Sequence, residues 1–295
     1  MRAAVIDGKA IAATIRAEAA EDAATLADQG WQPRLVSISV GDTAAAELYV
    51  RNQSRSAEAA GVQFETRTYP ETISMEQLVG VLHGLNADPR QRHHYSAPIA
   101  GAYPGEGAAK GGAPAQGCRG DAPGLDRQHR LQRSGVGAVY GGAVAILKTL
   151  PLSLEGLDVT VIGHSEIVGK PIAFLLMGLG ATVTVCHHMT RSVAMHSRAA
   201  DAVFVAVGRA GLVTGEMIRP GAALIDIGIN RVETDDGVRT VGDADFDSCA
   251  QVAGWITPVP GGVGPVTVAT LMKNAVLATR MQMDHYRDMY ARTDI

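Results

Sequence analysis

Short apolar runs that end next to a glycine recur through the second half of this chain, and they constrain its fold more than any other feature. The runs span 158–162, 181–186, 202–207 and 223–227, and glycines follow the first, third and fourth of them. A helical pattern begins near Val168, between the first two runs. Strands that alternate with helices form mostly parallel sheets. We therefore expect an α/β domain over roughly 157–272.

The first part of the chain shows the same alternation on a smaller scale. Amphipathic stretches predict helices over 9–29, 43–60 and 74–85, with Thr43 as a candidate N-cap, and extended runs predict strands over 35–40 and 64–69. Glycines stand directly after the first two helices and after the first strand. Further helices are expected from about Gly142 and from Pro265 onward. The chain is thus predicted to be α/β throughout, with two domains.

Composition excludes several classes of protein. With 46% hydrophobic and 19% charged residues among 295, the chain is expected to be globular rather than disordered. A formal net charge of −4 without a basic stripe argues against nucleic acid as a partner. We expect no membrane span and no apolar signal sequence. Three cysteines without metal-ligand spacing predict no disulfide framework, no metal site and a reducing, cytoplasmic setting.

Residues 91–138 differ in composition from the rest of the chain. Only Ile99, Leu125, Leu131 and Val136 are aliphatic there, and Gly, Ala, Pro, Arg and Gln fill most other positions. No period of two or of 3.6 residues persists, so the pattern predicts no regular element.

The turn after the first strand of the second half favours a dinucleotide site. It reads GHSEIVGKP over 163–171, with one glycine ending the strand and another opening a helix whose amides can face a pyrophosphate. The spacing is looser than in the three-glycine fingerprint, and a purely structural turn is the alternative.

The end of the second strand bears on which dinucleotide binds. About 20–25 residues past the first glycine, NAD enzymes usually carry an acid that binds the ribose hydroxyls. This chain has His188 and Arg191 there instead, which would tolerate a 2′-phosphate. The pattern favours NADP, unless both side chains only occupy a solvated loop.

Several motifs together resemble a known enzyme family. They are GHSEIVGKP, the CHH of 186–188, DIGINR at 226–231, VGDADF at 241–246, VGDTAAAELYVRN at 40–52 and, above all, ITPVPGGVGPVTVATL at 256–271. These resemble the bifunctional methylenetetrahydrofolate dehydrogenase / methenyltetrahydrofolate cyclohydrolase family. The likeness extends over nearly the whole chain except about 91–140.

The resemblance implies a fold and a reaction. The fold would be a Rossmann-like NADP-binding domain over 149–273, a folate-side α/β domain over 1–148 with a cleft between them, and a C-terminal helix over 274–295 that returns to the first domain. The reaction would be oxidation of 5,10-methylenetetrahydrofolate by NADP, then hydrolysis to 10-formyltetrahydrofolate. The partners would be tetrahydrofolate one-carbon derivatives and a second copy of the chain.

The resemblance also implies roles for individual residues. Gly163, His164, Ser165, His188 and Ile229 would bind the cofactor. Tyr49 would stack on the folate ring and, with position 53, would form the catalytic pair. The segment Pro260, Gly261, Gly262, Val263 and Gly264 would contact folate.

Gln53 is the first departure from the family pattern. The family has Tyr-x-x-x-Lys, whereas this chain reads Tyr49-Val50-Arg51-Asn52-Gln53. An amide forms hydrogen bonds but does not exchange protons at neutral pH. We therefore expect weak hydrolysis, whereas hydride transfer, which depends mainly on alignment, could persist.

The second departure is the family's Gln-Leu-Pro-Leu-Pro-like strand and Asp-Val-Asp-Gly-like turn, which are missing between Asp88 and Gly163 although the length is kept. One hypothesis is a compensated pair of frameshifts in GC-rich DNA, and the alternatives are genuine divergence or a flexible loop. Neither Asp121 nor Asp126 has the neighbours of a catalytic aspartate. Two other functions stay open: a catalytically silent paralogue that binds dinucleotide or folate, and a dehydrogenase of another small substrate.

Overall fold

The protein is described by a computed structural model that covers residues 2–41, 44–87, 93–96, 137–235 and 237–291. The chain divides into two compact units. The first comprises Met1–Ala12 and Val139–Thr267, and the second comprises Ala13–Ala138 and Val268–Ile295. None of the described helices combines the length and the hydropathy that a membrane-spanning helix needs.

A six-stranded parallel sheet forms the centre of the first unit. Its strand order is β1-β11-β8-β7-β5-β6, with bounds Ala4–Val5, Trp255–Ile256, Ala223–Asp226, Ala202–Val205, Asp158–Ile162 and Thr182–Cys186. Strands β7 and β8 are buried along their whole length, as expected for central parallel strands. The order reverses on either side of β5, so the carboxyl ends of β5 and β7 meet at the place where doubly wound sheets bind ligands.

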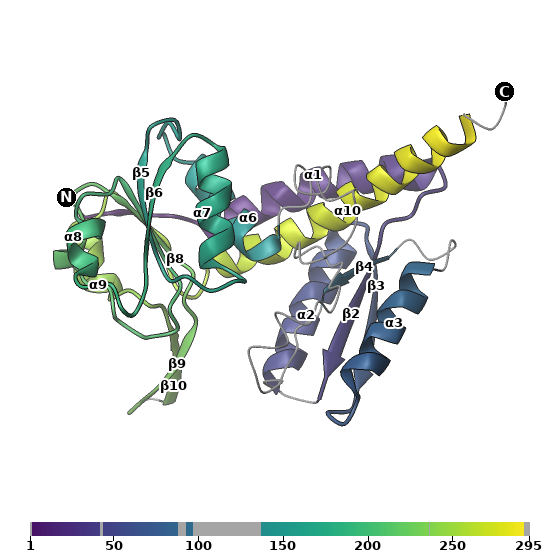
Figure 1. Ribbon diagram of the computed structural model, residues 1–295, viewed down its shortest axis with the longest axis horizontal. Helices are drawn as coiled ribbons and strands as arrows, with labels where there is room; N and C mark the ends of the chain where they lie inside the picture. Colours follow the sequence, from purple (N-terminus) through teal and green to yellow (C-terminus); the bar gives the residue numbers. More distant parts are fainter. Residues whose placement is uncertain (1, 42–43, 88–92, 97–136, 236, 292–295) are drawn as a thin grey trace. The chain divides into compact units, whose positions relative to one another are not determined.

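Helices and one hairpin complete the first unit (Figure 1). The helices are α6 (Ala138–Lys148), α7 (Gly169–Gly178), α8 (Val193–Ser197) and α9 (Phe246–Ala250), with a 3₁₀ turn at Gly215–Met217. Strands β9 (Asn230–Thr234) and β10 (Gly237–Val241) pair antiparallel and extend away from the parallel sheet. The hairpin starts directly after the loop at the carboxyl end of β8, so its first residues lie beside that end of the sheet.

The second unit contains a smaller parallel sheet with helices on both faces. Strands β3 (Gln63–Tyr69), β2 (Arg34–Val40) and β4 (His93–Ser96) lie in that order. Its long helices are α1 (Gly8–Asp28), α2 (Ala44–Ala59), α3 (Met75–Ala87) and α10 (Val263–Ala291). Leu35 packs with residues of α1, α2 and α10, whereas Val36, Ile38 and Val40 pack with α3. This alternation follows the two-residue period of a strand.

Local signals explain where the second unit's helices begin and end. Ser74 and Gln77 form a reciprocal capping box before α3, with N–H to side-chain oxygen distances of 3.1 and 2.9 Å. Gly61, with φ of +65°, follows α2, and the Val62 N–H donates back to the Ala57 carbonyl at 2.9 Å. This is the helix-ending motif that favours glycine. The predicted helix and strand positions in this part of the chain are confirmed to within a few residues.

The expectation of no regular element within 91–138 is wrong at its start. Residues His93–Ser96 form β4, which pairs parallel with β2 from Arg34 to Ser37. A four-residue strand beside a buried neighbour needs no apolar alternation of its own, so its polar sequence concealed it. The rest of that range up to 136, with Asp121 and Asp126, lies outside the described residues, as does the predicted cap Thr43.

The compact units group residues differently from the ranges 1–148, 149–273 and 274–295. Helix α6 belongs to the first unit from Val139 onward, because Gly142 packs against the backbone of Val266 and Thr267. The first twelve residues join the same unit because β1 pairs with β11. Helix α10 is continuous through residue 273, where the predicted ranges placed a boundary.

Candidate functional site

The turn between β5 and α7 is built from close backbone contacts. Gly163 adopts φ of +121°, and a Cβ added there would lie 2.2 Å from the Ala206 carbonyl oxygen. A Cβ on Gly169 would lie 2.0 Å from the Gly163 carbonyl oxygen. Both positions therefore require glycine, and the turn brings the end of β5, the end of β7 and the start of α7 together.

This turn fits the phosphates of a dinucleotide. The Val168 N–H donates to Ser165 Oγ at 3.2 Å, which orders the segment just before α7. No described side chain caps the first turn of α7. The Lys170 N–H donates to the Ser165 carbonyl at 3.1 Å, and Pro171 has no N–H, so the Gly169 N–H and the positive end of the helix dipole are what this end offers to an anion. Glu166 and Lys170 pair with each other one helical turn apart at the same end.

Three histidines gather beside this turn. The ring centroid of His164 lies 4.9 Å from that of His187 and 6.0 Å from that of His188. The centroids of His187 and His188 are 5.9 Å apart. The structure thus brings the predicted residues His164 and His188 together and adds His187, for which the sequence pattern predicted no role.

The loop after β6 holds these histidines in place. The His187 N–H donates to Thr190 Oγ1 at 2.9 Å, and the Thr190 N–H donates to the His187 carbonyl at 2.9 Å. The Met189 N–H donates to His187 Nδ1 at 3.1 Å, so the proton of neutral His187 lies on Nε2. His188 and Met189 are exposed at the tip. Burial raises the pKa of the preceding Cys186 thiol, which is a core residue.

Ile229 lies at the carboxyl end of β8 with 71% of its surface exposed. A large aliphatic residue this exposed beside a loop cluster is available for contact with a ligand. It is flanked by Gly228, where an added Cβ would lie 2.2 Å from the Asp243 carboxyl carbon. The backbone at Gly228 is therefore pressed against a buried acid.

Asp226 and Asp243 are buried carboxylates beneath these loops, and the sequence pattern predicted no role for either. Asp226 Oδ1 accepts from the N–H groups of Gly228 at 2.9 Å and Asp243 at 3.1 Å, and its Oδ2 accepts from Ala244 at 2.8 Å. Burial raises the pKa of Asp226 to about 6, against the opposing effect of these backbone donors. A Cβ on Gly242 would lie 1.9 Å from Asp226 Oδ2.

The PGGVGP segment packs on the start of α1. A Cβ added to Gly8 would lie 2.0 Å from the Gly262 carbonyl oxygen, and Gly261 has φ of +106°. Pro260 and Gly264 are exposed, whereas Gly262 and Val263 are buried. The segment thus offers backbone and a proline ring to a ligand, while Val263 starts α10 inside the core.

Gln53 lies in α2 and is fully buried. Tyr49 lies one turn earlier in the same helix, and its side chain is outside what the structure describes. Gln53 and Tyr49 belong to the second unit, whereas the cofactor turn and PGGVGP belong to the first.

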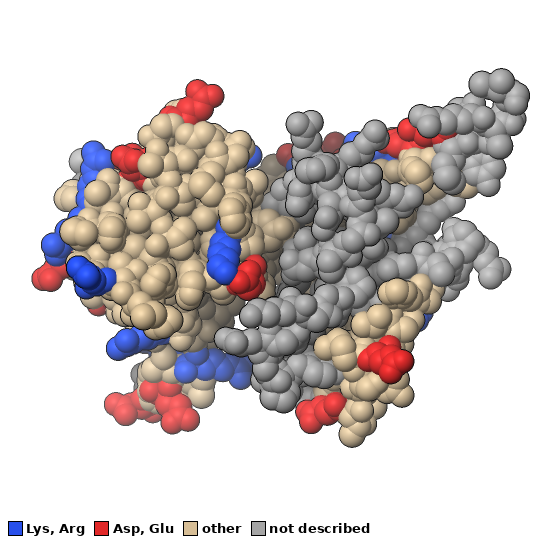
Figure 2. All heavy atoms as spheres, in the orientation of Figure 1, with Lys and Arg blue, Asp and Glu red and all other residues tan. Residues whose placement is uncertain are grey.

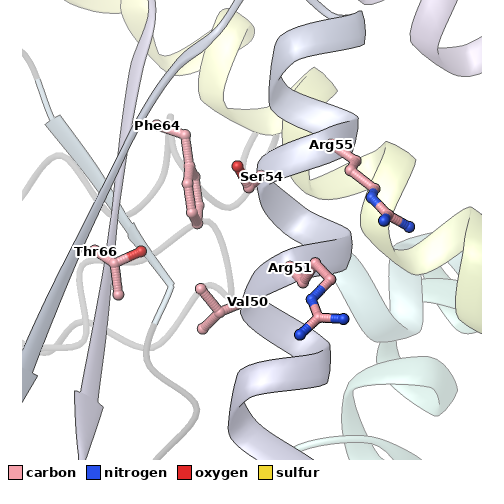
Figure 3. Close-up of a pocket in the computed structure, with 6 residues that line it drawn as sticks. All are labelled: Val50, Arg51, Ser54, Arg55, Phe64 and Thr66. Carbon is pink, nitrogen blue, oxygen red and sulfur yellow. The ribbon is translucent and has the colours of Figure 1, made fainter.

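A surface hollow lies beside α2 (Figure 3). It is an open depression of about 760 Å³ between α2 and β3, lined by Val50, Arg51, Ser54, Arg55, Phe64 and Thr66. Arg51 and Arg55 point away from the Phe64 ring. Arg51 is exposed, so it does not replace the missing lysine at the buried position 53.

In the part of the chain that the structure describes, neither charged nor metal-ligating side chains form another candidate site. No group of three or more His, Cys, Asp or Glu residues there could hold a metal ion. On the face of the first unit shown in Figure 2, basic and acidic side chains are scattered among uncharged residues. The loops at the carboxyl ends of β5, β6 and β8 therefore form the candidate site.

Two family models match the chain in tandem. Residues 6–92 match the catalytic domain of tetrahydrofolate dehydrogenase/cyclohydrolase, and residues 138–283 match the NAD(P)-binding domain of the same family. These matches leave 93–137 between them, which coincides with the stretch of unusual composition.

Relatives and solved structures agree with these matches. The chain is 48% identical to bifunctional protein FolD 2 of Mesorhizobium japonicum, over 98% of this chain and 95% of the relative. It is 46% identical to bifunctional protein FolD of Rhodobacter capsulatus, over 95% and 94%. The Trypanosoma brucei methylenetetrahydrofolate dehydrogenase-cyclohydrolase, solved with NADP and an inhibitor, superposes with a TM-score of 0.85 at 32% identity, covering 96% of this chain and 99% of that one.

Proposed function

The chain belongs to the tetrahydrofolate dehydrogenase/cyclohydrolase family, and on that premise we propose that it oxidises 5,10-methylenetetrahydrofolate with NADP and hydrolyses the methenyl product to 10-formyltetrahydrofolate, with hydrolysis impaired by Gln53. The observation that carries the proposal is the glycine turn at 163–169, whose close backbone packing fits a dinucleotide. Similarity to proteins named as bifunctional enzymes supports a catalytic role over a silent paralogue.

In this proposal the first unit holds the dinucleotide. Gly163, His164 and Ser165 face its phosphates, and Ile229 contributes apolar contact from the end of β8. A dinucleotide held there would supply the hydride acceptor for the one-carbon unit. The residues of the chain align and shield the reacting groups rather than take part in covalent chemistry.

His188 and Arg191 favour NADP over NAD. Neither side chain repels a 2′-phosphate, and residues 187–191 contain no acid that would bind the free ribose hydroxyls. The neighbouring rings of His164 and His187 add further N–H donors to this corner.

On the folate side, the proposal gives Tyr49 a stacking role and assigns the segment Pro260 to Gly264 to contact with the substrate. Pro260 is exposed and Gly261 has no side chain, so both are available for contact with a flat ring system. Gln53 takes the place of the proton-exchanging lysine. Its amide can hydrogen-bond to a substrate but cannot activate water for hydrolysis.

One cuvette can test both activities. Purified protein is mixed with methylenetetrahydrofolate and NADP, and the appearance of NADPH is followed together with the rise and decay of the methenyl absorbance. We expect NADPH to form and methenyl to accumulate, because oxidation outpaces hydrolysis. Absence of NADPH formation would contradict the proposal, and methenyl that disappears as fast as it forms would contradict the assigned effect of Gln53.

We also propose that two copies of the chain associate through the edge of the larger sheet. Strand β6 is an edge strand, so one side of its backbone has no partner within that sheet. Helix α7, which packs on it, exposes 69% of Phe174 and 48% of Met177. Exposed apolar side chains beside an unpaired edge are typical of an interface. We place the dimer in the cytoplasm, in keeping with the buried, free thiols of Cys186 and Cys249.

The substitution Phe174→Glu tests this interface by light scattering after size-exclusion chromatography. We expect wild type to elute as a dimer and Phe174→Glu as a monomer. Val238→Glu, at another exposed apolar position on the β9–β10 hairpin, should leave the dimer intact. A monomeric wild type, or a dimer unaffected by Phe174→Glu, would contradict the assignment.

A further inference from the structure

We propose that Asp243 is a positioning residue of the dinucleotide site, and that its buried carboxylate fixes the loop after β7 and the start of β9. The inference rests on the proposed function, because it concerns the same cofactor. It assigns a role to a side chain that lies beneath the site and is itself fully buried.

Asp243 accepts four hydrogen bonds from separate donors. Its Oδ2 accepts from the N–H groups of Val207 at 2.6 Å and Gly208 at 3.0 Å. Its Oδ1 accepts from the Arg209 N–H at 2.8 Å and from Asn230 Nδ2 at 2.8 Å. Strands β7 and β8 are adjacent in the sheet. The segments that follow these two strands thus both donate to one carboxylate.

Only an ionised carboxylate satisfies this set of donors. All four groups present hydrogen atoms, and a carboxylate offers two oxygens with lone pairs and no hydrogen. An asparagine would turn its NH₂ group toward two of the donors, so two N–H groups would lose their acceptor and face another donor. Buried N–H groups without an acceptor are unfavourable, because the hydrogen bonds that they made to water are not replaced.

The loop itself has the form of an anion site. Three successive N–H groups that donate to the two oxygens of one carboxylate, with Gly208 at φ of +68°, form a concave nest of the kind that binds phosphate in other proteins. Here an internal anion fills the nest. The loop at 207–209 therefore has no amides left for the cofactor's phosphates, which leaves that task to the turn at 163–169.

The network continues to the segment that carries PGGVGP. The Asp243 N–H donates to Asp226 Oδ1 at 3.1 Å, and the Asp226 N–H donates to Thr257 Oγ1 at 2.7 Å. Thr257 stands three residues before Pro260. A continuous chain of hydrogen bonds thus links the loop after β7 with the segment proposed to contact folate. Asp243 therefore fixes the backbone at 207–209 and at the start of β9, beside the turn proposed to hold the dinucleotide.

The substitution Asp243→Asn tests the inference, and Asp245→Asn is its matched control. Asp245 caps α9, with its Oδ1 accepting from the Ser248 N–H at 3.2 Å, and asparagine caps helices about equally well. The measurements are the NADP dissociation constant of the protein without folate, by calorimetric titration, and amide hydrogen exchange at 207–209. Asn230→Ala, which removes one donor and keeps the carboxylate, gives a milder variant if Asp243→Asn folds poorly.

We expect Asp243→Asn to raise the NADP dissociation constant about tenfold or more, in line with the loss of one or two buried hydrogen bonds. Exchange at 207–209 should accelerate, Asn230→Ala should shift both quantities less in the same direction, and Asp245→Asn should shift neither. Faster exchange with unchanged NADP affinity would overturn the positioning role, and unchanged exchange would overturn the anchoring. A wild type that binds NADP without oxidising methylenetetrahydrofolate would contradict the proposed function, while the binding comparison would still decide this inference.

Discussion

Replacing Gln53 with lysine is the most direct way to test why hydrolysis should be weak. Gln53 is fully buried in α2, and Ser56, three residues on, presents a buried hydroxyl on the same helix face. A lysine introduced there would be desolvated, which lowers its pKa toward neutrality. That is the state in which an amine can both take and give a proton during hydrolysis.

The size of each effect follows from the position. Positioned acid–base groups typically contribute about 10²- to 10⁴-fold, so methenyl hydrolysis by Gln53→Lys should rise by at least about tenfold. The longer side chain overpacks a filled site, at a cost of about 1–3 kcal/mol in the free energy of unfolding. For domains of roughly this size, that corresponds to a fall in Tm of about 2–4 °C for each kcal/mol.

The assay follows the decay of preformed methenyltetrahydrofolate across a range of pH, with a no-enzyme blank. Gln53→Met is the control, since it has similar length and no proton to exchange. The hydrolysis rate of Gln53→Lys should vary with pH, whereas the rates of wild type and Gln53→Met should stay near the blank. If folded Gln53→Lys, still able to form NADPH, hydrolyses methenyl no faster than Gln53→Met, the argument from proton exchange is wrong.

Three further predictions concern the first unit. Gly163→Ala should destabilise the fold by about 2 kcal/mol or more and abolish NADP binding, because its methyl group would meet the Ala206 carbonyl; urea unfolding and titration calorimetry measure the two effects. Because burial raises the pKa of Asp226 from 3.8 to about 6, its contribution to the free energy of unfolding is present in full below pH 3.8 and is lost as the pH rises through 6. The free energy of unfolding of wild type should therefore fall relative to that of Asp226→Asn as the pH rises from about 4 to about 6. An identical pH dependence of the two free energies would refute the assignment. The double substitution of His188 and Arg191 by alanine should weaken binding of NADP about tenfold or more and that of NAD little, and equal losses for both dinucleotides would show that neither side chain meets the 2′-phosphate.

The sequence predicted strands well where burial is continuous. The run DVTVI matches β5 residue for residue, and the runs before Gly208 and Gly228 contain β7 and β8. Such runs are mostly apolar and are followed by a glycine, so both pattern and boundary are local. Strand β4 and the β9–β10 hairpin were missed because their residues are mostly polar, and their pairing depends on neighbours distant in sequence.

The candidate site was predictable where a motif carries its chemistry on consecutive residues. Gly163, His164 and Ser165 were predicted in this way, and their role as cofactor-binding residues stays a prediction. Asp243 was quoted within a motif but given no role, because its four donors come from two other segments of the chain. A lone acid after a strand gives no sign of which amides will converge on it.

Two glycines beneath the site limit the substitutions that the fold tolerates. The carboxylates of Asp243 and Asp226 occupy the places that a methyl group on Gly228 and on Gly242 would take, at 2.2 and 1.9 Å. In a saturation library screened only for folded protein, positions 228 and 242 should accept no substitution, while exposed Ile229 beside them should accept many. Adding a selection for oxidation of methylenetetrahydrofolate should then restrict position 229 as well. Comparing the two screens would separate the residues that the fold demands from those that the cofactor demands.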